Sequence, residues 1–453
     1  MQVITPSTIV QPRGLTNAAG LRRFRQALSD ADSYVTRGIA RGGIDVLCIG
    51  DSIGQGYMTH AVATKNHTKH LNNWFRLFAK RLQGDFNPSP NMGGWGYLQG
   101  NMDTSYSFDL TGLSATSAGT VLNGIGYDDT ALQTLRIASA ASKANRVAIR
   151  LGGYGHPLNS SDLEFVFREY GSATSLLYDL NAGSAAGTGS GDIASGTVAT
   201  AAGSTTYGKR SSVVTFDQSQ DTYLQAAGNS SGTNPLFLNG VILYRNDYYT
   251  GVRCHNLACA SQTSTGYAGT ADGTPSGGGS ANTGRLQANI DNWCTQSATI
   301  GGAIDTRLII LELGTNDFGT GNSGGSYAAV VSLQQYYQNM KTIISRAISQ
   351  PSAPSILLYC PVPPKIAGLW AHAAGSKPEE YRAAMRQLVA EFPDDVAMFD
   401  ACDFYGVSYN SSAYATLYDG KLNEDDIHPP TDEQPRLASA IYTAATGLQS
   451  AGA

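Results

Sequence analysis

Charged side chains are scarce in this chain. Asp, Glu, Lys and Arg make up only 14% of the 453 residues, and the formal net charge is -5 at neutral pH. Because there is also no long basic run, the sequence argues against nucleic-acid binding as the main activity. The surface must depend on Ser, Thr, Asn, Gln and Gly, and the 52 glycines exceed the usual share. This composition is typical of exposed β structure and loops.

Long apolar runs are missing as well. No stretch approaches the ~18 apolar residues of a membrane-spanning helix. Residues 1–14 lack the basic and then apolar pattern of a secretory signal peptide. The sequence therefore predicts neither a membrane span nor a signal peptide, in a chain long enough for two or three domains.

Cysteines are few, and their spacing follows no known pattern. The six lie at positions 48, 254, 259, 294, 360 and 402, and they resemble neither a metal cluster nor a disulfide framework. Cys48 and Cys360 lie in apolar runs that are typical of strands, so we expect buried free thiols there. Cys254 and Cys259 can pair with each other or with other cysteines. The prediction is a reduced protein without a metal.

The stretch Val46–Gly56 is the first with a chemical signature. Four apolar residues run into Gly50-Asp51-Ser52, and glycines follow at 54 and 56. This pattern predicts a buried parallel strand whose carboxyl end opens into a turn. Ligands bind at that edge of an open α/β sheet, where a serine surrounded by backbone N–H groups can act as a nucleophile. Asp, Ser and Gly are also common in ordinary turns, so this stretch alone leaves both interpretations open.

Alternating strands and helices on both sides of residues 100–250 predict an α/β fold with a doubly wound parallel sheet. The expected strands are 44–49, 308–313, 356–360 and 396–399. The expected helices are 16–31, 71–82, 286–293, 327–348, 378–392 and a last one that opens with a capping box at 431–434. The glycine-rich segment 93–97 is expected to be a loop.

Residues 100–250 differ from their surroundings. Runs of β-branched and aromatic residues at 147–151, 163–167, 175–180, 212–216 and 237–244 are separated by turn-rich tracts, which predicts an antiparallel β-sandwich. Residues 182–208 are nearly all Ala, Gly, Ser and Thr and are expected to form a long exposed loop or a hairpin tip. We therefore divide the chain into an N-terminal arm and helix (1–40), an α/β domain (41–100 and 250–453) and an all-β sandwich-like insertion (101–249).

Further reactive side chains lie at the ends of expected elements. Asn316 follows a buried strand, which puts its amide at the carboxyl edge of the sheet. Asp425 precedes His428 by three residues, just before the last helix, and Asn256–Ser264 follows the β region. Together with Ser52 these segments supply a nucleophile, a base, an orienting carboxylate and an amide donor.

Three of these motifs resemble the first, third and fifth sequence blocks of the SGNH (GDSL-type) hydrolases. They are Gly50-Asp51-Ser52, Gly314-x-Asn316-Asp317 and Asp425-x-x-His428, and their order along the chain also matches. The resemblance covers roughly residues 40–100 and 250–450 and leaves out the β region.

The resemblance implies a role for each matched residue. Ser52 would be the nucleophile, His428 the general base and Asp425 the carboxylate that orients the imidazole. The Ser52 backbone N–H and the Asn316 amide would form part of an oxyanion hole. The third oxyanion donor of the family belongs to a glycine, where this chain has Ser261. A backbone N–H needs no glycine unless φ is positive, so Ser261 remains the predicted donor.

Other polar residues are assigned structural roles. We expect Asp51 to hold the turn through hydrogen bonds rather than to transfer protons. Asp317 and Asp426 are expected to be structural or solvated. The remaining histidines lack a sequence partner of this kind and are assigned to the surface or to loops; they are at positions 60, 67, 70, 156, 255 and 372.

The family resemblance implies ester hydrolysis by acyl transfer through Ser52, with no metal and no cofactor. The accompanying β region favours O-acyl groups, such as acetyl, on a cell-surface carbohydrate, although sandwiches also serve as spacers. The alternative is a structural or glycan-binding protein on an inactive SGNH scaffold, which the residue at Ser261 favours.

A second resemblance concerns the N-terminus. The helix Leu21–Leu28 leading into Gly50-Asp51-Ser52 is similar to bacteriophage tail proteins that carry SGNH domains. The missing signal-peptide pattern and the Gly/Ala/Ser/Thr tracts agree with that source. This resemblance implies a virion-associated or extracellularly acting enzyme that docks with other tail proteins through its N-terminus and forms a homo-oligomer.

Overall fold

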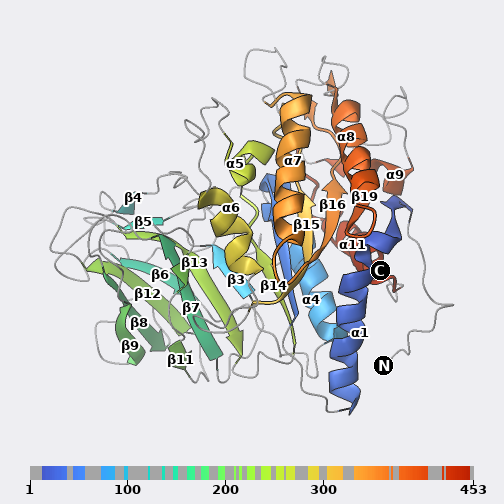
Figure 1. The fold of residues 1–453 in the computed structure, drawn as a ribbon. Helices are drawn as coiled ribbons and strands as arrows, with labels where there is room; N and C mark the ends of the chain where they lie inside the picture. Colours follow the sequence, from blue (N-terminus) through green and yellow to red (C-terminus); the bar gives the residue numbers. More distant parts are fainter. Residues whose placement is uncertain are drawn as a thin grey trace.

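A six-stranded sheet with the strand order β1-β19-β16-β15-β2-β14 forms the centre of one half of the protein (Figure 1). The computed structural model describes residues 13–37, 44–56, 73–86, 96–99, 121–122, 135–137, 146–150, 161–168, 175–182, 192–198, 209–210, 214–216, 222–229, 236–245, 251–259, 262–270, 284–294, 304–319, 331–366, 369–370, 377–406, 421–422 and 425–448. The strands of this sheet are β1 (Leu15–Thr16), β2 (Ile44–Gly50), β14 (Val252–Asn256), β15 (Thr306–Glu312), β16 (Ser355–Cys360) and β19 (Val396–Asp400).

The sheet is parallel except at one edge, where β1 pairs antiparallel with β19. In chain order the five parallel strands are arranged 2-1-3-4-5, which is a doubly wound topology. This confirms the predicted parallel sheet. The order reverses between β2 and β15, so the carboxyl ends of these two strands border the crevice where such sheets bind ligands.

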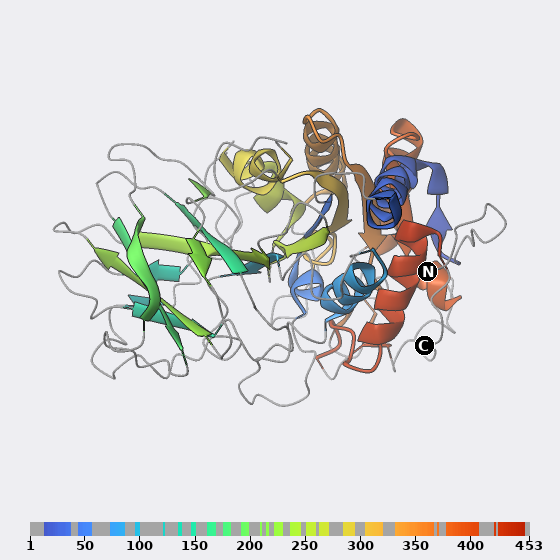
Figure 2. The same cartoon turned by 90° about the horizontal axis from the view of Figure 1, so that it is seen from below.

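Helices cover both faces of this sheet, which explains why its parallel strands are buried along almost their whole length. One hydrophobic cluster packs α1 (Arg22–Arg37), α4 (Trp74–Phe86) and α11 (Gln434–Thr446) against one face. The other packs α5 (Ser264–Ala268), α6 (Gly284–Asn289), α7 (Leu333–Ile348) and α8 (Pro378–Glu391) against the opposite face. Figure 2 shows α4 and α11 on one side of the sheet and α7 and α8 on the other. The short helices are η2 (Ala18–Leu21), α2 (Ser52–Gln55), η5 (Asp291–Trp293) and α9 (Ala401–Tyr405).

The N-terminal helix packs on this core. Leu21, Phe24 and Leu28 are buried in the same cluster as α4 and α11, and Leu15 of β1 joins them. The partner of the predicted helix is therefore the sheet face itself, so the described part of the N-terminal arm is integral to the α/β unit.

The last helix does not begin with the predicted capping box. It starts at Gln434, and the residue before it makes no capping hydrogen bond with its side chain. The Gln434 side chain makes tertiary contacts instead, because its Oε1 accepts from the Trp74 backbone N–H at 2.8 Å and its Nε2 donates to the Pro429 carbonyl at 2.8 Å. These two bonds tie α11 to α4 and to the loop that precedes it.

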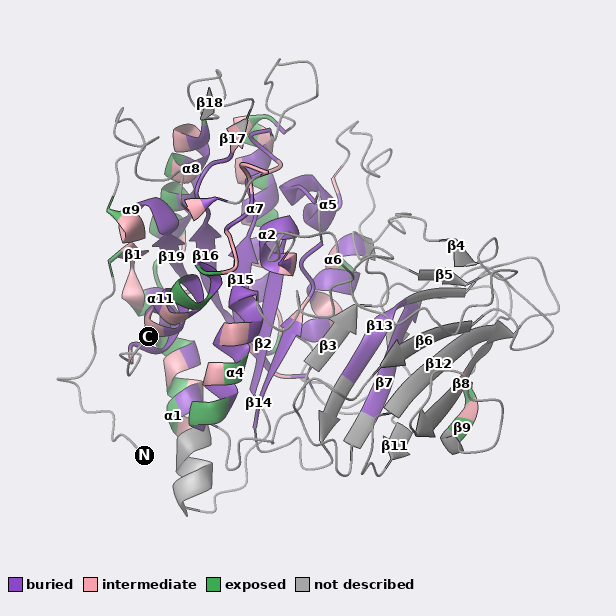
Figure 3. Ribbon diagram, turned by 180° about the vertical axis from the view of Figure 1, so that it is seen from behind, coloured by how far each residue is buried: buried purple, intermediate pink, exposed green. Residues whose placement is uncertain are grey.

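In the β region the described elements are strands: β3 (Gly96–Gln99), β4 (Val121–Leu122), β5 (Leu135–Ile137), β6 (Arg146–Arg150), β7 (Ser161–Arg168), β8 (Ser175–Ala182), β9 (Asp192–Val198), β10 (Lys209–Arg210), β11 (Val214–Phe216), β12 (Thr222–Asn229) and β13 (Leu236–Arg245). They form an antiparallel seven-stranded sheet around β7 and β13 and an antiparallel four-stranded sheet, β6-β12-β8-β9. β3 lies beside β14 of the α/β sheet, and β13 and then β7 follow β3 (Figure 3). The sandwich packing and the domain boundaries stay predictions.

Two loops of the sequence analysis contain strands. β9 lies within 182–208, and β3 begins inside the glycine-rich segment 93–97. Gly196 of β9 stands opposite Tyr178 of β8, and a Cβ at Gly196 would lie 2.6 Å from the Tyr178 hydroxyl oxygen. The small residues therefore leave room for a neighbouring aromatic ring, which composition alone does not reveal.

All six cysteines are buried and free, so the alternative in which Cys254 and Cys259 form a disulfide is not realised. None of the described helices is long and apolar enough to cross a membrane. A small hairpin of β17 (Lys365–Ile366) and β18 (Leu369–Trp370) completes the described elements.

Candidate active site

Ser52 lies where β2 ends, as the first residue of the short helix α2. Asp51 caps this helix, and its Oδ1 accepts a hydrogen bond from the Ile53 backbone N–H at 2.9 Å. The prediction that Asp51 holds the turn is therefore confirmed. The Ser52 side chain is thereby placed at the carboxyl edge of the sheet, and 7% of the residue's surface remains exposed.

His428 joins Ser52 across 376 positions of sequence. Its Nε2 lies 2.6 Å from Ser52 Oγ, and its Nδ1 lies 2.6 Å from Asp425 Oδ2. The other Asp425 oxygen, Oδ1, accepts from the backbone N–H groups of Ile427 and His428, each at 3.1 Å. Between the two residues the backbone turns through Asp426, whose φ is 60°. The sequence-predicted serine, histidine and aspartate thus form one continuous hydrogen-bonded chain.

The charge on Asp425 is stabilised by its neighbours. Partial burial acts to raise the pKa of Asp425, but the hydrogen bond and charge of His428 outweigh it, helped by the backbone N–H groups of His428 and Ile427. The pKa therefore lies below its ordinary value. A carboxylate that stays ionised beside Nδ1 fixes the tautomer with the proton on Nδ1, which leaves Nε2 to accept from the serine hydroxyl.

Asn316 lies at the same edge of the sheet, because β15 pairs with β2 in register up to Glu312 and Gly50. Its Nδ2 donates one hydrogen bond to the Gln262 carbonyl at 2.9 Å. A side-chain amide has two N–H groups, so this bond orients the amide while the second N–H can point elsewhere. The geometry suits an amide that donates to a developing oxyanion.

The segment around the third predicted donor is anchored on both sides. Ser261 itself lies outside the described residues. Before it, the Cys259 backbone N–H donates to the Gly50 carbonyl at 3.0 Å. After it, the Ser264 backbone N–H donates to the buried Asp317 carboxylate, with N–O distances of 3.0 and 3.1 Å. Asp317 is therefore structural, as predicted, and it fixes the start of α5 behind this segment.

Two residues that the sequence analysis missed support the Ser52 turn. Glu312 Oε2 accepts from the backbone N–H groups of Asp51 and Gly54, each at 3.0 Å. Asn256 donates from Nδ2 to the Gly54 carbonyl at 2.9 Å. A glutamate at the end of an otherwise apolar strand was the available signal for the first, because a buried acid needs a partner.

A second histidine and aspartate pair lies near the other end of β2. His255 is fully buried, so its assignment to the surface or a loop is wrong. Its Nε2 lies 2.7 Å from Asp45 Oδ1, and Arg253 Nη2 lies 2.6 Å from Asp45 Oδ2. Asp45 is fully buried; burial acts to raise its pKa, but the charges and hydrogen bonds of Arg253 and His255 outweigh burial and lower the pKa well below its ordinary value. The partner of His255 comes from a neighbouring strand, so sequence spacing could not reveal it. The other five histidines assigned to the surface or loops lie outside the described residues.

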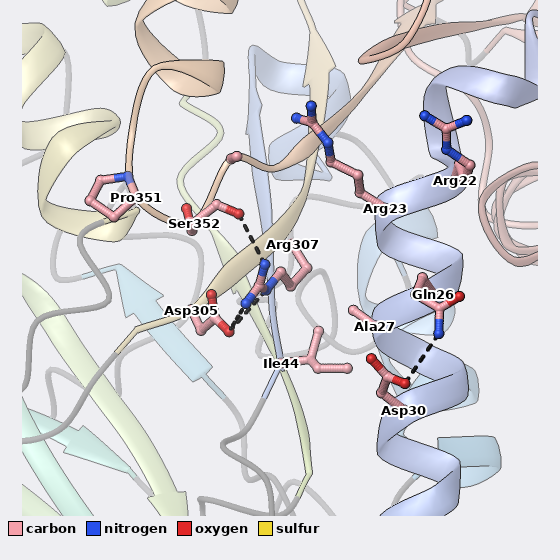
Figure 4. Close-up of a pocket in the computed structure, with 11 residues that line it drawn as sticks. Arg22, Arg23, Gln26, Ala27, Asp30, Ile44, Asp305, Arg307, Pro351 and Ser352 are labelled. Atoms are coloured by element: carbon pink, nitrogen blue, oxygen red, sulfur yellow. Dashed lines mark hydrogen bonds and ion pairs between the residues drawn. The ribbon is translucent and has the colours of Figure 1, made fainter.

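A cavity of about 770 Å³ lies away from Ser52, at the amino ends of β2 and β15 (Figure 4). It is lined by Arg22, Arg23, Gln26, Ala27, Asp30, Ile44, Asp305, Arg307, Pro351, Ser352 and Ala353. Its arginines have acidic partners: Arg23 lies 2.6 Å from Asp395, and Arg307 lies 2.8 Å from Asp305. None of the four described site residues lines this cavity. Within the part of the chain that the structure describes, no group of three His, Cys, Asp or Glu residues is arranged to hold a metal ion.

The fold is similar to that of a solved peptidoglycan O-acetylesterase over nearly the whole chain. The TM-score is 0.55 at 13% sequence identity, and the match covers 95% of this chain and 97% of that one. A carbohydrate esterase family 2 enzyme with a carbohydrate-binding domain, from Corynascus thermopiles, gives a TM-score of 0.28 at 10% identity and covers 66% of this chain and 92% of its own. A GDSL-like lipase from Bacteroides thetaiotaomicron gives 0.28 at 13% identity, with 42% and 75% covered. No protein-family profile and no curated protein matches the chain. The first similarity supports the predicted α/β fold.

Proposed function

We propose that the protein is a serine esterase that removes O-acyl groups, acetyl above all, from cell-surface carbohydrate. The observation that carries this proposal is the chain of contacts Asp425–His428–Ser52, with 2.6 Å at each step, at the carboxyl edge of the parallel sheet. Such a chain is the arrangement that converts a weakly nucleophilic hydroxyl into an acyl acceptor.

We assign a residue to each step of the reaction. Ser52 Oγ attacks the ester carbonyl carbon while His428 Nε2 takes its proton, and Asp425 stabilises the resulting imidazolium. The negative charge moves to the carbonyl oxygen, where Asn316 and the Ser52 and Ser261 backbone N–H groups are the proposed donors. The imidazolium then returns its proton to the departing alcohol. Water, deprotonated by His428, releases the acid from Ser52 by the reverse sequence.

The proposed substrate class rests on one structural similarity and on the β region. The solved peptidoglycan O-acetylesterase matches this chain over 95% of its length, and the match therefore includes most of the β region as well as the α/β sheet. A β unit beside strand β14 of the α/β sheet is the proposed surface for holding a polysaccharide. The proposal that the enzyme acts from a virion tail, or otherwise outside the cell, and as a homo-oligomer rests on the N-terminal sequence resemblance alone.

The function is tested by labelling and product analysis together. A fluorophosphonate probe should label the wild-type protein and not Ser52→Ala. Acetate release should be measured from O-acetylated peptidoglycan and O-acetylated polysaccharides, alongside aryl esters of short and long acyl chains. We expect acetate release from at least one acetylated glycan and a decline in rate as the aryl ester chain lengthens. Binding of an acetylated glycan without labelling or acetate release would favour the inactive, glycan-binding alternative that Ser261 suggests.

A further inference from the structure

Two carboxyl groups lie beneath the Ser52 turn. Asp51 immediately precedes Ser52, and Glu312 is the last residue of β15, where it stands in register with Gly50. Both are completely buried. A Cβ at position 50 would lie 2.6 Å from Glu312 Oε2, so the glycine is what allows the carboxyl group to approach the turn so closely.

One oxygen of each carboxyl group holds the backbone of the turn. Glu312 Oε2 accepts from the N–H groups of Asp51 and Gly54, and Asp51 Oδ1 accepts from Ile53. Three backbone N–H groups that flank Ser52, those of Asp51, Ile53 and Gly54, are thus bound by two side chains. Displacement of either carboxyl group would move the Ser52 backbone and side chain together.

The second oxygen of each carboxyl group is in a different environment. Asp51 Oδ2 and Glu312 Oε1 are buried, and within the described part of the chain neither accepts an N–H or a hydroxyl at hydrogen-bond distance. The two carboxyl groups lie close enough for each to influence the charge of the other. Two carboxylates have no donor to offer each other, whereas a carboxylic acid and a carboxylate can form a hydrogen bond.

We propose that Asp51 and Glu312 share a proton and act as a positioning pair that fixes the nucleophile turn, a role that rests on the proposed esterase function of Ser52. Burial raises the pKa of Asp51 to about 7. Burial, together with the charge of Asp51, raises the pKa of Glu312 well above its ordinary value. The pair therefore keeps at least one proton at neutral pH.

Among the described residues, the groups around the pair do not offer a counter-charge. The titratable side chains that interact electrostatically with one or both members are acids: Asp317, Cys48, Tyr267, Tyr336 and Tyr359. The His428 imidazole contacts the Ser52 hydroxyl, on the turn that the pair holds. Loss of the last proton at alkaline pH would leave two adjacent buried negative charges, and their repulsion would pull Glu312 away from the Asp51 and Gly54 N–H groups. Activity should then fall as pH rises.

The first experiment compares two replacements of Glu312 by kcat and KM across about pH 6 to pH 10. In Glu312→Gln the amide oxygen can accept from both backbone N–H groups, and the amide N–H can donate to Asp51 in place of the shared proton. Glu312→Leu can do neither. We expect Leu to lower kcat by about 10²-fold with little change in KM, and Gln to lower it by no more than about tenfold. Gln should also abolish the alkaline decline, because an amide has no proton to lose.

The second experiment does not depend on activity. Between the ordinary glutamate value of about 4.3 and the Asp51 value of about 7, the folded pair holds a proton that the unfolded chain has released. The unfolding constant of the wild type should therefore rise with pH about tenfold more per unit than that of Glu312→Gln over about pH 5 to pH 7. Asp394→Asn, which removes a carboxylate with a side chain 73% exposed, serves as the control and should keep the wild-type slope.

The outcomes separate the two proposals. Equal pH slopes for wild type and Glu312→Gln would overturn the shared proton, as would a Gln variant whose kcat is as low as that of the Leu variant. A wild type that neither hydrolyses esters nor reacts with fluorophosphonate, but shows the steeper slope, would overturn the esterase function and leave the shared proton supported.

Discussion

Two histidine and aspartate pairs lie near opposite ends of β2 and have almost the same geometry. His428 Nδ1 lies 2.6 Å from Asp425 Oδ2, and His255 Nε2 lies 2.7 Å from Asp45 Oδ1. Their surroundings differ. Asp425 has 23% of its side chain exposed, and His428 Nε2 points to a serine hydroxyl. Asp45 has no exposed surface, and its second oxygen binds Arg253.

The difference shows that a short histidine and aspartate contact does not by itself identify a catalytic site. In the buried pair, His255 Nε2 and both Asp45 carboxylate oxygens form internal hydrogen bonds. Asp45 Oδ2 also accepts from the Asp305 backbone N–H. In the pair at the carboxyl edge, His428 Nε2 faces the hydroxyl of Ser52, the proposed nucleophile. We therefore expect the buried pair, His255 and Asp45, to determine stability, and the pair at the carboxyl edge, His428 and Asp425, to determine activity.

The largest effect is expected at the carboxyl edge. Ser52→Ala and His428→Ala should each lower kcat by about 10⁴- to 10⁶-fold, and the double variant should be little slower than either, because nucleophile and base act as one unit. Urea unfolding should show little change for Ser52→Ala. A double variant slower by the product of the two single losses would contradict the shared role.

The buried pair should show the opposite pattern. Asp45→Ala leaves Arg253 and His255 buried without their carboxylate, so the free energy of unfolding should fall by about 3–5 kcal/mol. The kcat per folded molecule should stay close to that of the wild type. Asp394→Ala, which breaks an exposed and loose ion pair, is the matched control and should have little effect on either quantity. A loss of kcat in folded Asp45→Ala would show that the two pairs are coupled.

Asn316 provides a test within the carboxyl edge. Asn316→Ala should lower kcat by about 10²- to 10³-fold with little change in KM, since its hydrogen bond strengthens as charge develops on the carbonyl oxygen. Asn316→Asp should be worse, because a carboxylate repels the oxyanion. If Asn316→Ala raises KM alone, the amide is a substrate contact and not part of the oxyanion hole.

Acid should distinguish the two aspartates. Both have a pKa below the ordinary value, so each contributes stability that is present above about pH 3.9, the unfolded value, and is lost as pH falls through the folded value. Asp45→Asn should flatten the decline in stability below about pH 4 more than Asp425→Asn does, because the Asp45 carboxylate is fully buried and binds both Arg253 and His255. Urea midpoints over a pH series measure this. Parallel acid declines for both variants and the wild type would contradict it.

The smallest effect is expected at Ser261. Only its backbone N–H is proposed to contribute, so Ser261→Gly should change kcat by less than about tenfold. A gain larger than that would indicate that the serine side chain obstructs the site, as the inactive-scaffold alternative implies.

The sequence predicted the parts of this fold and site that depend on local pattern. The apolar runs that end at Gly50 and Gly314 are buried strands, and the three-residue spacing of Asp425 and His428 closes into one turn. It could not predict contacts that depend on strand order. Asp45 and His255 lie 210 positions apart and meet only because β14 returns to the side of β2.

Other differences come from side chains that a composition count treats as neutral. Gly196 lies in a strand, and the Tyr178 side chain on the neighbouring strand occupies the space that a Cβ at position 196 would need. Gln434 fits a capping pattern, yet it begins its helix and bonds instead to Trp74 and Pro429. In both cases a tertiary partner overrides the local signal.

The separation of Ser52 and His428 also sets an order on biosynthesis. Ser52, the proposed nucleophile, is synthesised 376 positions ahead of His428, its proposed base. β2 cannot take its central position until both flanking strands, β14 and β15, have been made. The His428 loop is held in turn by Gln434 of the last helix. A nascent chain that ends before His428 therefore carries Ser52 without its proposed base, and the proposed esterase activity can arise only after the segment from His428 to Gln434 has been made.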